Sequence, residues 1–536
     1  MEILDDRKVA PQVDTESTNQ TADSACNPML SWLFPIGLFL LVTLRIVLVL
    51  PSILDFRNFA FRDIGSFQTV DRLIGLGLRP GVDFGFNYGL LGVLLQHAYF
   101  ALFGSGHWPT LGLLAVYWLL MLVFWILLSR EIGQSLLGFC VLLGLSDLMI
   151  YFGPWSPTPA HILQNLSLAY GLYFLGKRRL SLALSIAVLG TLSVPSLPIV
   201  LSGLLSVAIV WEWGRNPGRT GRGLLAQFAP AAATYAGSVL LLTAFFGWRT
   251  VLPTLLPLRG ARHYRAMHFG FFGQGKFFWH PPDAHLSYYL ITPAGIWLLC
   301  SALLVAFGCL AAVRIARNAK PEGPSLFILA CCALHLCFVF LAFGNSMSYI
   351  GFSFILIAGI FAGVSAMTNR RLKLALTSLL LVLGLMSQWR GIDDALQVWK
   401  HESIAQDTAA LYTPIDFQPE WKSVLSVAQH GRVFLLSFGN GVDLYHPEIA
   451  TPQSWMLLPG LNLPREDAYV LQQIQTADVV VEEYEVAPQY IDRNKAWQAA
   501  LRDFPVKVSG RYFRIWTRDA TVTHELLKAS TFHVME

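Results

Sequence analysis

Charged residues are scarce in this sequence, and their scarcity defines the class of protein. Asp, Glu, Lys and Arg make up only 13% of the 536 residues, whereas ordinary soluble domains carry roughly 25%. Apolar residue types make up 54% of the chain. The composition therefore indicates extensive lipid-facing surface rather than a fully soluble protein. No long basic run occurs and the net charge is only +4, so nothing indicates a nucleic-acid partner.

Cysteine patterns that would indicate a disulfide framework or a metal site are also missing. No CxxC pair and no Cys/His cluster occurs, and six of the seven cysteines lie within apolar runs. We interpret these cysteines as small apolar packing residues and predict no metal site. No cofactor is predicted either, although the sequence leaves a requirement for a divalent cation open.

Internal repeats and soluble-enzyme motifs are lacking as well. Many transporters are built from duplicated halves, so the absence of a repeat speaks against a transporter. The polar C-terminal part contains no nucleophile triad, no Gly-rich phosphate loop and no HExxH pattern. The segment "SFGNGVD" (437–443) is too isolated a glycine pattern to indicate phosphate binding. We therefore assign no catalytic role to the C-terminal part.

Long apolar runs are what the sequence does contain. A membrane span needs about 20 predominantly apolar residues to cross about 30 Å of hydrocarbon. Residues 1–29 are polar and lack apolar periodicity, so they are predicted to form a disordered cytoplasmic tail. Eleven spans are predicted after this tail, at residues 31–54, 109–129, 135–152, 161–176, 180–194, 196–212, 224–246, 288–313, 325–343, 350–367 and 372–388.

Basic residues give the orientation of these spans. The positive-inside rule places loops rich in Lys and Arg in the cytoplasm. If all such loops share that side, the N-terminus lies inside and the C-terminus outside. The shorter apolar run 89–104 must then be a re-entrant or interfacial helix on the outer side. The basic loops are residues 176–180, 213–223, 314–320 and 368–373.

The sequence thus predicts a polytopic α-helical protein of the cytoplasmic (inner) membrane with a small C-terminal α/β domain outside it. The multi-span domain covers residues 30–388, and its large outer loops are 55–108 and 247–287. Residues 389–536 form the extracytoplasmic domain. Its predicted strands are short runs rich in β-branched and aromatic residues, and its predicted amphipathic helices have apolar residues at helical spacing. The strands are 432–438, 478–484 and 511–518, and the helices are 465–475 and 492–504.

The first outer loop contains an unusual concentration of charge, "RDIGSFQTVDRLIGLGLRPGVDFGFNYG" (62–89). Its first part has apolar residues at helical spacing and is predicted to be an amphipathic helix on the outer membrane surface. Asp63 stands at the start of that helix, where a carboxylate is favoured. Taken alone, Asp63 is interpreted as a helix cap and Asp83 as a turn residue.

In combination with the topology, this loop resembles the GT-C superfamily of integral-membrane glycosyltransferases, which includes protein O-mannosyltransferases and lipid A aminoarabinose transferases. The family pattern is an acidic residue soon after the first span, a surface helix, a second acidic residue and a "yGPL"-like re-entrant start. Here these elements are Asp63, "LIGLGLRPGVDFGFNYGLLG" and, within it, Asp83. The resemblance implies that Asp63 is the general base of an inverting sugar transfer, with Asp83 as second choice or orienting partner.

Two further segments complete the predicted site. Many relatives carry an acidic residue in the second outer turn, but this chain has "SPTPAH" and no carboxylate. His161 is either an acceptor-orienting residue or an ordinary helix-start residue. The loop 247–287 places positive charge among aromatic residues on the outer side, against the usual bias. It suits an anionic lipid phosphate, and its candidate ligands are Arg259, Arg262, His263 and Lys276.

We interpret the chain as a glycosyltransferase that moves a sugar from a polyprenyl-phosphate carrier to a glycan, lipid or protein acceptor on the outer face of the membrane. Its partners are then the lipid-linked donor, the acceptor and membrane lipid. Two alternatives stay open. The first is a transporter or flippase for a lipid-linked or anionic substrate. The second is a non-catalytic scaffold of an envelope-polysaccharide assembly.

Overall fold

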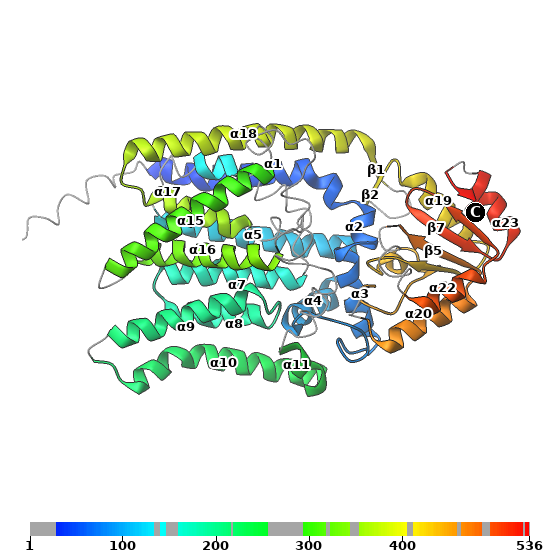
Figure 1. The fold of residues 1–536 in the computed structure, drawn as a ribbon, viewed down its shortest axis with the longest axis horizontal. Helices are drawn as coiled ribbons and strands as arrows, with labels where there is room; N and C mark the ends of the chain where they lie inside the picture. Colours follow the sequence, from blue (N-terminus) through cyan, green and yellow to red (C-terminus); the bar gives the residue numbers. More distant parts are fainter. Residues whose placement is uncertain are drawn as a thin grey trace, which may run out of the picture.

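The computed structural model shows a long helical bundle with an α/β domain at one of its ends (Figure 1). The bundle and the domain are formed by separate stretches of the chain, joined by the long helix α18 (Arg370–His401). The structure describes residues 28–132, 140–145, 159–215, 218–255, 293–317, 322–342, 353–404, 411–457, 462–484, 494–528 and 531–534.

A helix coincides with each predicted span that falls in the described residues. Five of the helices there, namely α5, α9, α10, α15 and α18, are long and apolar enough to cross a membrane. The protein is therefore an integral membrane protein, whereas the number of eleven spans stays a prediction. The bundle helices are α1 (Pro28–Ile53), α5 (His107–Ile132), α7 (Pro159–Gly176), α8 (Leu180–Thr191), α9 (Leu197–Arg215), α10 (Gly221–Phe246), α15 (Pro293–Arg317), α16 (Gly323–Ala342), α17 (Ser353–Ser365) and α18.

One end of the bundle carries basic residues from the loops that the sequence analysis placed in the cytoplasm. Figure 1 shows that α9 ends, and α10 and α18 begin, at the end far from the α/β domain. The helix ends there carry the basic residues Arg215 and Arg370. Helix α18 then runs the length of the bundle to the α/β domain, well beyond its predicted apolar segment 372–388.

Four shorter helices lie at the opposite end, next to the α/β domain: α2 (Phe56–Ala60), α3 (Asp63–Gly75), α4 (Leu90–Phe103) and α11 (Trp248–Leu255). Helix α4 coincides with the apolar run 89–104, whose re-entrant placement stays a prediction. Its 14 residues span about 21 Å at 1.5 Å per residue.

A close backbone contact fixes the start of α4. The backbone N–H of Gly89 donates to the carbonyl of Ser193 at 2.8 Å, and that of Leu91 donates to Leu192 at 3.0 Å. A Cβ atom on Gly89 would lie only 2.1 Å from the Leu192 carbonyl oxygen. Gly89, the first glycine of "YGLLG", is therefore required because the two backbones approach each other closely.

The C-terminal domain is a mixed sheet between two layers of helices. Six strands run in the order β4-β3-β5-β7-β6-β8, with parallel β4, β3 and β5 and antiparallel β5, β7, β6 and β8. A separate pair, β1 (Glu402–Ile404) and β2 (Tyr412–Pro414), connects α18 to the domain. The six strands are β3 (Val433–Leu436), β4 (Ile449–Ala450), β5 (Val479–Glu483), β6 (Val506–Ser509), β7 (Phe513–Thr517) and β8 (His533–Val534).

The three predicted strands are confirmed as β3, β5 and β7, and the two predicted helices as α20 (Pro464–Thr476) and α22 (Lys495–Arg502). Helices α20 and α22 cover one face of the sheet. The other face packs on α19 (Gln418–Ala428) and α23 (Ala520–Lys528). Both faces of β3 and β5 are consequently buried.

Each face of this sheet extends its hydrophobic core into the first outer loop. Phe434 and Leu436 share one core with residues of α3 and α4, including Phe67, Val70 and Leu90. Val433 and Leu435 share the other core with α2 residues Phe56 and Phe59. The C-terminal domain is therefore packed onto the first outer loop (55–108), in which the sequence analysis predicted the site.

The contact of Gly89 gives a direct test of the packing between the start of α4 and the turn at Leu192 and Ser193. Gly89→Ala should lower the free energy of unfolding by about 1–3 kcal/mol, because overpacking forces the Leu192 backbone to move. The matched control is Gly75→Ala at the end of α3, where a Cβ meets no atom within 4 Å. Thermal unfolding of the purified protein in detergent compares the two. Equal melting temperatures for both variants would contradict the assigned contact.

Candidate active site

Asp63 is the first residue of α3, at the end of the bundle that meets the C-terminal domain. The N-cap position belongs to Arg62, which makes no side-chain capping bond, so Asp63 lies inside the first turn. Carboxylates are stabilised there by the free N–H groups of the helix terminus. The side chain of Asp63 lies outside the described part of the structure, and its role as general base stays a prediction.

Helix α3 lies between α4 and the C-terminal domain, and its position on the outer membrane surface stays a prediction. Its apolar residues face the shared core, as amphipathic spacing requires. Its polar residues are also covered, because the C-terminal domain supplies partners for them. Gln68 is an example: its side chain donates to Thr110 Oγ1 at 3.0 Å and accepts from Tyr445 Oη at 3.1 Å.

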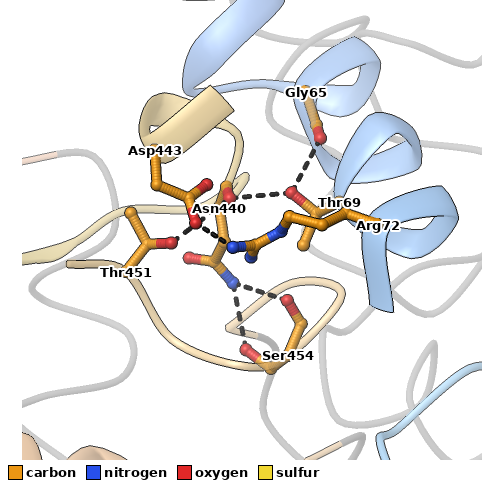
Figure 2. Close-up of polar contacts among 7 residues, drawn as sticks. All are labelled: Gly65, Thr69, Arg72, Asn440, Asp443, Thr451 and Ser454. Atoms are coloured by element: carbon orange, nitrogen blue, oxygen red, sulfur yellow. Dashed lines mark hydrogen bonds and ion pairs between the residues drawn. The ribbon is translucent and has the colours of Figure 1, made fainter. Parts of the chain in front are cut away.

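Figure 2 shows the centre of this contact. Thr69 Oγ1 donates to the carbonyl of Asn440 at 2.7 Å. One turn further along α3, Arg72 forms an ion pair with Asp443. The Asn440 side chain is fully buried and donates through Nδ2 to Ser454 Oγ at 3.0 Å. These bonds match the buried polar groups of α3 with partners from a segment about 370 residues away in sequence.

Asp83 is fully engaged by two arginines. Its Oδ2 accepts from the backbone N–H of Arg79 at 2.8 Å and from Arg79 Nε at 3.0 Å, and its Oδ1 accepts from Arg465 Nη1 at 2.8 Å. Burial raises the pKa of Asp83, but the hydrogen bonds and charges of Arg79 and Arg465 outweigh it, so the pKa lies below its usual range. This geometry favours a link between the first outer loop and α20 over a role as a base.

Glu466 is a second carboxylate that binds the same loop, and it is 4% exposed. Its Oε2 accepts from the backbone N–H groups of Gly85 at 2.7 Å and Leu463 at 2.6 Å. Burial raises the pKa of Glu466 to about 7, although these hydrogen bonds lower it in part. Glu466 thus caps α20 and anchors the glycine-rich "DFGFNYG" segment at once.

His161 lies where three parts of the chain meet. Its ring is 5.2 Å from the ring of Tyr88, in the first outer loop. Tyr88 in turn contacts Trp455 of the C-terminal domain, with ring centroids 5.3 Å apart, and stacks on Phe67 of α3 at 5.9 Å. The structure therefore brings the start of α7, the first outer loop and the C-terminal domain together at one aromatic cluster.

The predicted phosphate ligands Arg259, Arg262, His263 and Lys276 lie outside the described residues. The described chain leaves α11 at Leu255 and returns at Pro293 in α15. Helix α11 is at the same end of the bundle as α3 and α4. No group of three or more His, Cys, Asp or Glu side chains suited to a metal ion occurs in the described part of the chain.

Sequence reasoning missed several residues that organise this region. Asp71 Oδ1 lies 2.8 Å from His97 Nδ1, which links α3 to α4. Asp55 caps α2 by accepting from the Arg57 backbone N–H at 2.8 Å, and burial raises its pKa to about 6. Two of them carried a capping signal in the sequence: Asp55 is a preferred N-cap residue type before α2, and Glu466 follows Pro464 in the first turn of α20.

Comparisons with known proteins support the fold. No protein-family profile matches the sequence. No curated protein matches it. Among solved structures, the fold is similar to that of ArnT from Cupriavidus metallidurans bound to undecaprenyl phosphate. The TM-score is 0.52 at 13% sequence identity, covering 91% of this chain and 98% of ArnT. The apo form of that ArnT gives a TM-score of 0.47.

The resemblance stated from the sequence, to a superfamily that includes the aminoarabinose transferases, is confirmed at the level of the fold by this likeness to ArnT. The likeness extends over most of the chain, the bundle and the C-terminal domain included.

Glu466 yields a pH-dependent prediction. Because its pKa is raised from 4.5 to about 7, the folded protein binds a proton that the unfolded chain releases. The stability contributed by this group is present below pH 4.5 and is lost as the pH rises through 7. Glu466→Gln cannot ionise and keeps an acceptor for both N–H groups. It should raise the free energy of unfolding by about 1–3 kcal/mol at pH 8 and change it little at pH 5.

Thermal unfolding at the two pH values measures this difference. Asp503→Asn, which changes an exposed carboxylate of the same domain just after α22, is the control and should behave as wild type. An effect of Glu466→Gln that is equal at pH 5 and pH 8 would contradict the assigned burial.

Proposed function

We propose that this protein is an inverting glycosyltransferase that uses a polyprenyl-phosphate-linked sugar. The single observation that carries the proposal is the fold, which is shared with ArnT over most of the chain and has Asp63 opening α3 at the junction with the C-terminal domain. ArnT was solved with undecaprenyl phosphate bound, which supports a lipid-phosphate donor here.

In the proposed reaction, Asp63 acts as the general base. An acceptor hydroxyl attacks the anomeric carbon of the sugar from the side opposite the phosphate, and its proton passes to the Asp63 carboxylate. The bond between the anomeric carbon and the phosphate oxygen breaks, and polyprenyl phosphate leaves. A carboxylate at the edge of a low-dielectric membrane has a raised proton affinity, so it can take up this proton near neutral pH.

The donor phosphate requires cationic or hydrogen-bonding groups near Asp63. We assign this role to Arg259, Arg262, His263 and Lys276, because guanidinium and ammonium groups suit a phosphate at interfacial depth. The segment that carries them connects to α11, which lies at the same end of the bundle as α3. His161 would orient the acceptor, since its ring contacts Tyr88 of the first outer loop.

The orientation follows from the charge of the bundle ends. With the basic end in the cytoplasm, α3, α4 and the C-terminal domain lie outside. The proposal therefore includes eleven spans, an extracytoplasmic domain and transfer on the outer face of the cytoplasmic membrane. The acceptor is a glycan, a lipid or a protein.

The proposal is tested by Asp63→Asn on the chromosome, with membrane abundance confirmed. Loss of a general base costs about 10²–10⁴-fold in rate, so the variant should lose the same envelope glycan as a deletion strain. Mass spectrometry of the envelope glycans provides the comparison with wild type.

Asp83→Asn is the companion variant. Because Asp83 is engaged by Arg79 and Arg465, this change should weaken packing and leave most of the transfer. If Asp63→Asn retains the wild-type glycans while the deletion loses one, Asp63 is not the base. Complete loss in Asp83→Asn at normal abundance would move the assignment to Asp83.

A further inference from the structure

The segment directly before Asp63 is held by the C-terminal domain through its backbone. The N–H of Gly439 donates to the carbonyl of Phe61 at 2.9 Å, and the N–H of Gly441 donates to the carbonyl of Ala60 at 3.0 Å. Both glycines belong to "SFGNGVD", the loop after β3. The two residues that precede Arg62 are therefore fixed by a loop about 380 positions away in sequence.

Close approach explains why this loop contains glycine. A Cβ atom on Gly439 would lie 2.4 Å from the Arg62 carbonyl oxygen, and one on Gly441 would lie 2.7 Å from the Gly65 Cα. Neither glycine adopts a positive φ among the described residues. Glycine is thus required at both positions by contact with the turn around Asp63, namely with Arg62 before it and Gly65 after it.

A buried ion pair holds the neighbouring side chain. Arg62 Nη2 lies 3.2 Å from Glu483 Oε1, and the two side chains are 15% and 2% exposed. Glu483 ends β5, a strand buried on both faces, so its carboxylate has a fixed position. Separating a buried pair leaves an uncompensated charge, which opposes movement of Arg62 away from the domain.

We propose that the C-terminal domain is a working part of the catalytic site, with Gly439 and Glu483 as positioning residues that fix Asp63 through the residues next to it. This inference rests on the proposed role of Asp63 as general base. Catalytic groups must be held closely, since a misplacement of about 1 Å costs on the order of 10²-fold in rate. The contacts of Phe61 and Arg62 supply such a constraint from outside the membrane bundle.

Two variants test the proposal in the full-length protein. Gly439→Ala forces the Arg62 carbonyl to move, and Glu483→Gln removes the charge of the partner at nearly constant shape. The matched control is Glu482→Gln, which changes the adjacent and equally buried carboxylate whose partner is Arg514, at 3.5 Å. Membrane vesicles from cells producing each variant are assayed for the glycan that a deletion removes.

Transfer should fall at least tenfold in Gly439→Ala and Glu483→Gln and stay within twofold of wild type in Glu482→Gln. Binding of undecaprenyl phosphate, measured as the rise in melting temperature of the purified protein, should be unchanged in all three. A purely structural role would lower melting temperature and carrier binding together, or would affect Glu482→Gln equally.

The proposal is overturned if both positioning variants keep transfer within twofold of wild type, or if Glu482→Gln loses as much as they do. If Gly439→Ala is not recovered in folded form, the nearly isosteric Glu483→Gln decides. Failure of the proposed function is recognised separately, because Asp63→Asn would then retain wild-type transfer whatever these variants do.

Discussion

The architecture depends on the packing of the C-terminal sheet onto the first outer loop. Both faces of the sheet extend their hydrophobic cores into this loop, one through α3 and α4 and the other through α2. Helix α3 is consequently buried on its apolar and its polar side. Burying polar side chains costs free energy unless each is paired, and the domain provides those partners, as Thr69 with Asn440 and Arg72 with Asp443 illustrate.

This constraint explains the distribution of charge in the loop. Arg62, Arg72 and Asp83 are each paired with a residue of the C-terminal domain, so much of the charge that marks the loop serves docking. The turn before the first residue of α3 is thereby held by the C-terminal domain.

Elements set by local pattern could be predicted from the sequence. Apolar run length located the helices, and short runs rich in β-branched and aromatic residues located β3, β5 and β7. The two-residue strands β4 and β8 were missed because they carry too short a pattern, and their pairing is decided by neighbours in the sheet.

At the candidate site, Asp63 and His161 were selected from their positions in the sequence, next to predicted helix starts. The partners Glu483, Asp443 and Trp455 could not be predicted, since each contact joins residues hundreds of positions apart. The glycines of "SFGNGVD" were discounted as an isolated pattern, yet their contacts with the turn before α3 account for them.

In the proposed reaction, the lipid carrier, the base and the docked domain lie at the same end of the bundle. The most direct test is a cryo-electron-microscopy structure of the full chain in lipid nanodiscs with undecaprenyl phosphate. The account predicts the phosphate beside the start of α3, between Asp63 and the segment carrying Arg259 and Lys276, with the C-terminal domain docked on α2 and α3. A phosphate bound at the basic end of the bundle, or in a path through its centre, would contradict the transferase and favour transport.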